Sequence, residues 1–192
     1  MNKKIAFFFQ ILLVFIFLTL SSKADTKKNI IDNLKKTKAL SFNFKQTIDE
    51  NEETGKCFIK YPLLMKCNYQ DLKKKILISN GKTVAIIKKK YKKIYYYPIK
   101  STPLFFILKK ENILNLVINN EPRVIDSRFI EFELLDKKSN KLKIFFDVNS
   151  MELKGWETID AYSNIVSFII ENLTINPIIN DNFFKIPREE DL

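Results

Sequence analysis

Residues that commonly carry chemistry are sparse in this chain of 192 residues. There is no histidine, which removes histidine-based triads, histidine general bases and most catalytic zinc sites. Three glycines are too few for a glycine-rich loop that cradles phosphates. Two carboxylate pairs, Glu52 with Glu53 and Glu131 with Glu133, could act as acid and base, but their positions in a turn and along a strand favour solvated surface charge. The sequence therefore predicts a protein that is not an enzyme and holds no metal or cofactor.

The two cysteines, Cys57 and Cys67, flank a candidate turn. If Tyr61-Pro62-Leu63 is the turn of a hairpin, Ile59 lies opposite Met65 and Cys57 lies opposite Cys67, at disulfide distance. We predict that they are bridged, because the compartment inferred below is oxidising. The alternative is a pair of buried free thiols that act as small apolar residues. A redox-active pair is disfavoured because the spacing is not Cys-x-x-Cys.

The first 24 residues are typical of an export signal. Lys3 and Lys4 precede an apolar run from Ile5 to Leu20, and Ser22-Lys23-Ala24 places small residues at a cleavage position. Cleavage would leave a single domain over residues 25–192, long enough for a sizeable core. The alternative, an uncleaved membrane anchor, is disfavoured because about 16 apolar residues are short for a span of about 20.

The chain is basic, with a formal net charge of +11. Only Arg123, Arg128 and Arg188 are arginines among its 33 basic residues, and the chain is also rich in isoleucine and asparagine. Such a bias fits the codons of an AT-rich genome. Nucleic acid more often recruits arginine and interleaved aromatic residues, so we do not expect it as a partner.

From about residue 41 onward, short apolar runs separated by turns predict antiparallel β-strands. Asn80-Gly81, between apolar runs at 76–79 and 83–87, is the strongest hairpin signal, because both residues tolerate the positive φ angles of a type I′ turn. Later strands alternate apolar and charged residues, as in Ile130-Glu131-Phe132-Glu133-Leu134. One face of the sheet is therefore expected to be apolar and the other mostly wet.

Two segments interrupt this pattern. Residues 29–44 carry spaced apolar residues among lysines, which predicts an amphipathic helix running into a strand at 42–46. Ser101-Thr102-Pro103 then offers a helix N-cap and a proline at the first helical position, before the apolar run 104–108. A helix that is apolar on all sides must be covered or must contact an apolar ligand.

These elements predict a one-layer sheet of about nine to eleven strands, with short helices on its apolar concave face. So little helix would not fill a large curved sheet, which leaves room for a cavity lined by aromatic and aliphatic side chains. The alternative is a packed core, which periodicity alone favours, since most apolar faces are core. The pattern is compatible with both.

Several short motifs follow one another in a recognisable order. They are Phe42-x-Phe44-x-Gln46, Gly55 before Lys60-Tyr61-Pro62, residues 76–83, Thr102-Pro103 before an apolar helix, Asp160 near a turn, and Phe184-Lys185-Ile186-Pro187. With these motifs the sequence resembles the LolA family of periplasmic outer-membrane lipoprotein carriers. The resemblance covers nearly all of the mature chain.

The resemblance implies a mainly β fold with an α-helical lid, an open (incomplete) antiparallel β-barrel whose concave hydrophobic face is covered by short helices. It implies a soluble periplasmic chaperone that binds the acyl chains of lipoproteins in a hydrophobic cavity and carries them from the inner to the outer membrane. The implied partners are acylated lipoproteins, an inner-membrane ABC lipoprotein-releasing complex and an outer-membrane receptor. A monomer is expected.

Strand alternation together with the resemblance defines a lipid-binding inner face. Its expected residues come from the first hairpin, the next strand, the lid and two late strands: Ile59, Tyr61, Met65, Tyr69, Leu77, Phe105, Ile107, Leu108, Phe132, Leu134, Ile144 and Phe146.

The sequence also departs from the family. Tyr61 stands where an arginine usually helps to hold the lid shut, and Cys67 stands where tryptophan is common. The Tyr61 hydroxyl can still donate a hydrogen bond to a lid carbonyl, but it lacks the fork of donors of arginine. We therefore expect the lid to be held more weakly or in a different way.

Lys88-Lys89-Lys90-Tyr91-Lys92-Lys93 falls where a hairpin turn is expected. These lysines could rest on anionic lipid headgroups, or they could form a solvated turn in a lysine-biased protein. Two other functions are weighed against the carrier: a regulatory module that senses lipids or lipoproteins, and an exported structural β-domain with no ligand.

Overall fold

The computed structural model describes residues 25–192 except 73, 126, 136–140 and 161. The predicted export signal, residues 1–24, lies outside the described residues. The described part of the chain forms one sheet of eleven strands. In chain order they are β1 (Ala39–Ile48), β2 (Asn51–Lys60), β3 (Leu64–Tyr69), β4 (Lys75–Asn80), β5 (Thr83–Lys88), β6 (Lys93–Pro98), β7 (Arg123–Ile125), β8 (Phe129–Leu135), β9 (Lys141–Asp147), β10 (Leu153–Ile159) and β11 (Ile165–Ile175).

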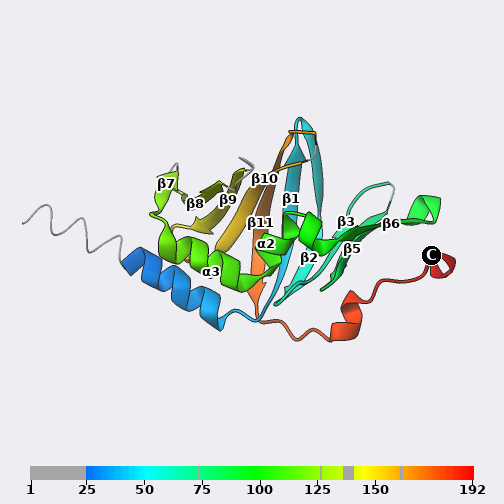
Figure 1. Cartoon of the computed structure of the whole chain (residues 1–192), viewed down its shortest axis with the longest axis horizontal. Helices are drawn as coiled ribbons and strands as arrows, with labels where there is room; N and C mark the ends of the chain where they lie inside the picture. Colours follow the sequence, from blue (N-terminus) through cyan, green and yellow to red (C-terminus); the bar gives the residue numbers. More distant parts are fainter. Residues whose placement is uncertain (1–24, 73, 126, 136–140, 161) are drawn as a thin grey trace, which may run out of the picture.

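The strands lie side by side in the order β6-β5-β4-β3-β2-β1-β11-β10-β9-β8-β7, and each neighbouring pair is antiparallel. Two meanders are thus joined where β1 pairs with β11, with Phe44 opposite Ile170. β6 and β7 are the two ends of the order, so the sheet is open, as predicted (Figure 1).

Hydrophobic alternation places the strands as the sequence predicts. In β2 and β3, Cys57, Ile59, Met65 and Cys67 are buried, while Phe58 and Lys66, which alternate with them, are half-buried. Side chains of a strand point alternately to opposite faces, so these buried residues share the inner face of the sheet.

The β4–β5 hairpin forms, but its turn is not the type I′ turn centred on Asn80 and Gly81. Gly81 and Lys82 are the two central residues, and only Gly81 has a positive φ, of 93°. Asn80 instead accepts hydrogen bonds through its side-chain oxygen from the amides of Lys82 (3.1 Å) and Thr83 (2.9 Å). The asparagine stabilises the turn through its side chain and not through its backbone conformation.

Three helices lie over the inner face (Figure 1). An N-terminal helix covers residues 25–36, and α2 (Leu104–Leu108) and α3 (Lys110–Asn119) follow β6. We call these three helices the lid. Four short 3-10 helices complete the described elements: η1 (Lys89–Tyr91), η2 (Ile99–Ser101), η3 (Asp181–Phe184) and η4 (Glu189–Asp191).

The predicted cap of α2 is wrong. Ser101 and Thr102 donate their hydroxyls backwards, to the carbonyls of Pro98 (2.7 Å) and Ile99 (2.9 Å), and α2 has no side-chain cap. Because η2 comes directly before α2, these hydroxyls close the preceding turn.

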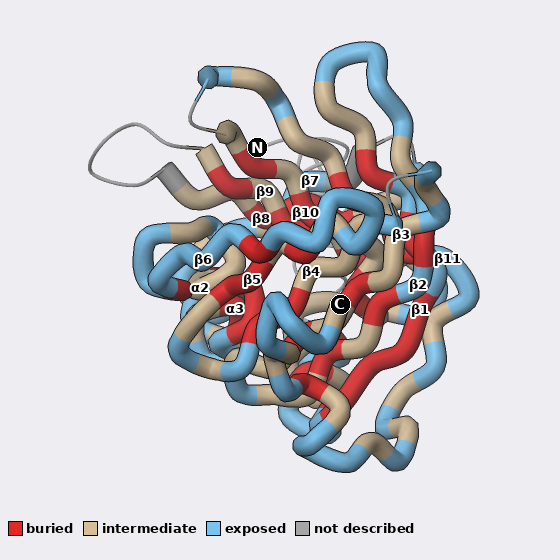
Figure 2. Tube along the Cα trace, turned by 90° about the vertical axis from the view of Figure 1, so that its right-hand side faces the viewer, coloured by how far each residue is buried: buried red, intermediate tan, exposed pale blue. Residues whose placement is uncertain are grey.

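The outer face of β2 to β6 is not wet, contrary to the sequence prediction. The C-terminal segment crosses it (Figure 2), and Phe183 packs edge-on against Phe58 with ring centroids 5.0 Å apart. Ile186 and Leu192 pack against a second apolar cluster formed by Ile78, Ala85, Ile87 and Ile94. The ammonium of Lys60 forms an ion pair with the carboxylate of Asp181 in this segment, at 2.5 Å. Alternation could not reveal this cover, because the covering residues lie about a hundred positions away in the chain.

Gly55 allows β1, β2 and β3 to approach closely. It lies opposite Phe44 in the sheet, and a Cβ atom on it would stand 2.7 Å from the Phe44 ring and would collide with the carbonyl oxygen of Asn68. A backbone atom cannot move aside as a flexible side chain can, so a larger residue forces the strands apart.

We predict that Gly55→Ala lowers the free energy of unfolding by roughly 1–3 kcal/mol, because it overpacks a close-packed site. Urea denaturation measures the change. Lys56→Ala, at the exposed neighbouring position, should stay within about 0.5 kcal/mol of wild type. Equal stability of the two variants would contradict the close packing.

Candidate functional site: the inner face and its lid

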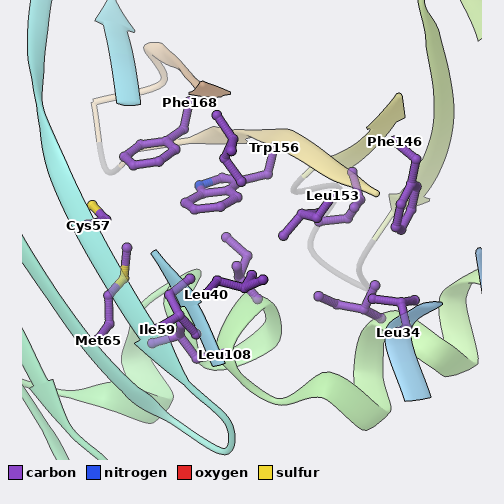
Figure 3. Packing of buried hydrophobic residues seen from close by; sticks show 14 of the residues in the cluster. Leu34, Leu40, Cys57, Ile59, Met65, Leu108, Phe146, Leu153, Trp156 and Phe168 are labelled. Carbon is purple, nitrogen blue, oxygen red and sulfur yellow. The ribbon is translucent and has the colours of Figure 1, made fainter. Parts of the chain in front are cut away.

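The sequence-predicted residues meet on the inner face of the sheet. All twelve belong to one continuous apolar cluster or pack directly against it. Figure 3 shows Ile59, Met65 and Leu108 close together and Phe146 at the far side of the cluster. Seven residues are buried: Ile59, Met65, Ile107, Leu108, Phe132, Ile144 and Phe146. Five are partly buried: Tyr61, Tyr69, Leu77, Phe105 and Leu134.

Four buried aromatic residues at the centre of this face were not among the predicted residues. The Phe168 ring stacks on Trp156 at 4.2 Å and on Phe44 at 4.7 Å, and Phe42 meets it edge-on at 6.2 Å. Figure 3 shows Trp156 and Phe168 pointing into the cluster. These rings form a continuous aromatic wall from β10 through β11 to β1.

The sequence pattern predicts part of this aromatic wall but not all of it. Phe42 and Phe44 are two positions apart in β1, so strand alternation places both on the inner face. In β10 the register shifts between Leu153 and Gly155, so Leu153 and Trp156 both reach the inner face although three positions separate them. A β-bulge of this kind breaks the period of two on which the sequence prediction depends.

Hydrogen bonds hold the lid at the rims of the sheet. The amide of Leu63, in the β2–β3 turn, donates to the carbonyl of Leu108 at 2.9 Å. Asn33 of the N-terminal helix donates its side-chain amide to the carbonyl of Ser150 at 3.1 Å, in the β9–β10 turn. Lys110 donates its ammonium to the carbonyl of Thr37 at 2.9 Å and so links α3 to the end of the N-terminal helix.

Apolar contact alone holds the lid to the middle of the sheet. Seven aliphatic side chains of the lid are buried in the cluster: Ile30, Leu34, Ile107, Leu108, Ile113, Leu116 and Val117. These side chains cover the inner face of the sheet, as the side chains of a second sheet do in a β-sandwich. Such non-directional contacts can be exchanged for any other apolar surface of similar size.

The inner face is filled in this closed arrangement. A cavity where the N-terminal helix meets the sheet has a volume of about 20 Å³, and its lining includes Leu34, Leu40, Tyr61, Phe146 and Leu153. That is room for about one water molecule. Of the two sequence alternatives, the packed core describes the closed state, and an acyl chain fits only if the lid moves.

Tyr61 does not hold the lid through its hydroxyl, so that expectation is wrong. Part of the side chain reaches solvent, but the hydroxyl is buried and has no hydrogen-bond partner among the described residues. Burial raises the pKa of Tyr61 above its ordinary value. The contact between the hairpin and the lid is made two residues later, by the backbone of Leu63.

Cys57 and Cys67 lie directly opposite each other in the β2–β3 ladder, as the turn at Tyr61-Pro62-Leu63 predicts, and a disulfide joins them. Their Cα atoms are 4.1 Å apart. Both side chains are buried beside Ile59 and Met65, so the bridge stiffens the part of the inner face nearest to α2.

The candidate acid and base residues are engaged in ion pairs. Glu53 lies 2.5 Å from the ammonium of Lys75, and Glu131 lies 2.5 Å from the guanidinium of Arg123. Glu131 is not solvated as expected, since it is only 4% exposed. Its hydrogen bond to Arg123 raises the pKa of that guanidinium. These carboxylates stabilise the sheet, and no pair of them faces a cavity.

No helix in the described ranges has both the length and the hydropathy that a membrane crossing demands. Residues 25–192, apart from the gaps given above, contain no group of three or more histidine, cysteine, aspartate or glutamate residues that could hold a metal ion.

An open antiparallel sheet with an apolar inner face under short helices is a fold of the binding or chaperone type. The family model described as outer membrane lipoprotein carrier protein LolA matches residues 35–187. The chain belongs to the LolA family. The comparison with curated proteins found no match.

Solved structures resemble this one at very low sequence identity. An uncharacterised conserved protein from Thermus thermophilus is 6% identical, with a TM-score of 0.52 over 87% of this chain and 95% of that one. A LolA superfamily protein from Nitrosomonas europaea is 7% identical, with a TM-score of 0.43 over 85% and 97%. MucB is 8% identical, with a TM-score of 0.49 over 88% of this chain, which spans only 64% of MucB.

We predict that the disulfide is fully formed in exported protein and stabilises the fold. Closing a loop with a sequence separation of 10 residues contributes about 2.7 kcal/mol in the chain-entropy treatment. The double variant Cys57→Ala/Cys67→Ala should lose about that much in urea denaturation. Mass spectrometry without reductant should find the wild type two hydrogens lighter than the reduced chain, and two free thiols would contradict the bridge.

We predict that Tyr61→Phe stabilises the protein, increasingly so at high pH. At pH 7 it removes an unpartnered buried hydroxyl, worth about 1 kcal/mol. Unfolded tyrosine ionises near pH 10 and the pKa of folded Tyr61 is higher, so the wild type loses stability above pH 10 and the variant does not.

Urea denaturation at pH 7 and pH 11 measures this difference. The advantage of Tyr61→Phe should grow by about 1.4 kcal/mol between the two pH values. Tyr162→Phe, at an exposed tyrosine, serves as the control and should show no such growth. An advantage of Tyr61→Phe that does not change with pH would mean that the hydroxyl is solvated.

Proposed function

We propose that the protein is a periplasmic carrier that binds the acyl chains of lipoproteins between its inner face and its lid and takes them from the inner to the outer membrane. The observation that carries the proposal is the continuous apolar inner face, covered by helices that are hydrogen-bonded at the rims. Membership of the LolA family supports it. The twelve predicted residues, together with the aromatic wall, form the proposed acyl-binding surface.

Magnitudes favour exchange of the lid side chains for acyl chains. Exposing the seven buried aliphatic side chains of the lid costs roughly 10–20 kcal/mol, at about 1.5–3 kcal/mol each. Transferring one acyl chain of about fifteen methylenes out of water contributes about 12 kcal/mol. One chain thus nearly balances the opening of the lid, and two or three chains exceed it.

This balance suits a carrier. A single-chain lipid gains little by opening the lid, whereas a lipoprotein with several acyl chains gains enough. The lid side chains then compete for the inner face again when a membrane offers the acyl chains a better solvent. Release therefore needs no source of energy within the carrier, only an acceptor that is more apolar than the inner face.

The proposed partners follow from this cycle. A lipoprotein anchored in the inner membrane must be lifted out by an active machine, for which we propose an inner-membrane ABC lipoprotein-releasing complex. At the outer membrane, a receptor or the bilayer itself accepts the acyl chains. We propose that the carrier acts as a monomer, because its apolar inner face is already covered by its own lid.

The filled inner face favours one other function, an exported structural β-domain without a ligand. The cavity of about 20 Å³ is the specific observation behind this alternative. The two functions differ in what happens when an acylated ligand is supplied: the carrier opens and binds it, and the structural domain does not.

We predict that the exported protein binds a triacylated lipopeptide at least tenfold more tightly than a single-chain lysophospholipid. Native mass spectrometry and fluorescence titration of a labelled lipopeptide measure the two affinities. The unacylated peptide is the control and should not bind. Absence of triacylated lipopeptide binding would favour the structural domain.

A crosslink between lid and rim tests the opening step directly. Asn33→Cys/Ser150→Cys, at positions in contact across the rim, joined by a short bifunctional thiol reagent, should lose lipopeptide binding at least tenfold. Each single-cysteine variant, treated with the same reagent, should bind as the wild type does. Undiminished binding by the crosslinked protein would show that this part of the lid stays closed during binding.

A further inference from the structure

The β5–β6 hairpin carries an exposed aromatic surface that the inner face does not use. Four of the seven tyrosines in the chain lie within residues 91–97. Their exposed fractions are 53% for Tyr91, 44% for Tyr95, 54% for Tyr96 and 43% for Tyr97. A cluster of large exposed rings at one place marks an interaction surface, whereas single exposed rings do not.

Lysines surround these rings. Lys89, Lys90, Lys92 and Lys93 are exposed in and beside η1, and Lys88 lies with its ammonium 5.2 Å from the centre of the Tyr95 ring. We call residues 88–97 the hairpin patch. Its composition, amphipathic rings among cations, is that of protein segments that lie at a membrane interface.

The positive charge of the hairpin patch is not neutralised by its surroundings. None of its lysines forms an ion pair within the described ranges of the chain. Among the acidic residues of η4, Glu190 and Asp191 pair with Arg188, while Glu189 contacts the hairpin patch at its backbone, where it accepts a hydrogen bond from the amide of Ile94 at 3.0 Å. The pKa of Lys66 is lowered by burial and, in addition, by the nearby positive charge of Lys89.

The exposed edge of β6 is a poor site for an added strand from a protein partner. The amides of alternate residues, beginning with Ile94, point away from β5. Glu189 occupies the amide of Ile94, and Pro98 has no amide to donate. Only Tyr96 can then offer an amide to an added strand, and flanking lysines further discourage pairing. The side chains of the hairpin patch, and not its backbone, are therefore available for contact.

We propose that the hairpin patch docks the protein on an anionic lipid bilayer, with its lysines on the phosphate headgroups and its tyrosine rings at headgroup level. Tyr95 and Tyr97 pair with Ile86 and Val84 in the sheet and so lie on the same side as Val84, which is part of the inner-face cluster. Docking through this hairpin brings the β6 end of the sheet to the bilayer surface. The docking itself does not require the carrier function.

Vesicle flotation tests the docking with the purified exported protein. Vesicles of phosphatidylcholine mixed with phosphatidylglycerol should bind at least tenfold more protein than vesicles of phosphatidylcholine alone. Each lysine near such a surface strengthens binding by about fivefold, so Lys89→Gln/Lys90→Gln/Lys92→Gln/Lys93→Gln should weaken binding to the mixed vesicles by at least tenfold. Added salt should weaken wild-type binding, because it screens exposed charges.

Matched controls separate the hairpin patch from net charge. Lys35→Gln/Lys36→Gln/Lys38→Gln/Lys56→Gln removes the same charge at four exposed positions outside the hairpin and should bind as the wild type does. Tyr91→Ser/Tyr95→Ser should bind several-fold more weakly, with the urea midpoint showing that the fold persists. Equal binding to both kinds of vesicle, or equal loss in the two quadruple variants, would overturn the proposal. Crosslinking of the hairpin to an acidic protein without vesicle binding would do so as well.

Discussion

Everything in this fold follows from the need to cover one apolar face of a sheet that has no second sheet opposite it. Alternation in β2, β3, β8 and β9 puts the apolar side chains on the inner face, and exposure of that whole face to water would cost far more than a domain's net stability. The chain meets this need with three short helices instead of more strands. Helices of five to twelve residues can cover the face, but they cannot form with it the backbone hydrogen bonds that join neighbouring strands.

The attachment of the lid determines what the inner face can do. Leu63 and Asn33 make directional bonds between sheet and lid at the rims, while the buried contact with the middle of the sheet is aliphatic. Aliphatic contact does not distinguish the side chains of the lid from the methylenes of a ligand. In the carrier cycle proposed above, the filled closed state and a ligand-accepting open state would be two uses of the same surface. The wall of Phe44, Phe168 and Trp156 belongs to the sheet and not to the lid.

The outer face of the sheet is stabilised in a different way on each side of the β1–β11 junction. Over β2 to β6 the C-terminal segment covers a second apolar cluster, and the edge of β6 is closed by Glu189. Over β8 to β10, charged residues pair across the strands, with Glu131 between Arg123 and Lys143 and with Lys143 bonded to Glu157, which raises the pKa of Lys143. The outer face is thus stabilised by the C-terminal segment on one side and by ion pairs on the other, without help from the lid.

The sequence by itself determined what depends on near neighbours in the chain. The period of two in β2, β3, β8 and β9 set the inner face. The position of the β2–β3 turn set the register that brings Cys57 opposite Cys67, because a hairpin is decided within about ten residues. Only the tertiary structure decided how far the lid fills the hollow, that the Tyr61 hydroxyl has no partner among the described residues, that Glu131 is buried and that Phe183 covers Phe58. The contact of Phe183 with Phe58 and the packing of the lid on the sheet join residues far apart in the chain, and Trp156 reaches the inner face through a bulge in β10, which no local pattern encodes.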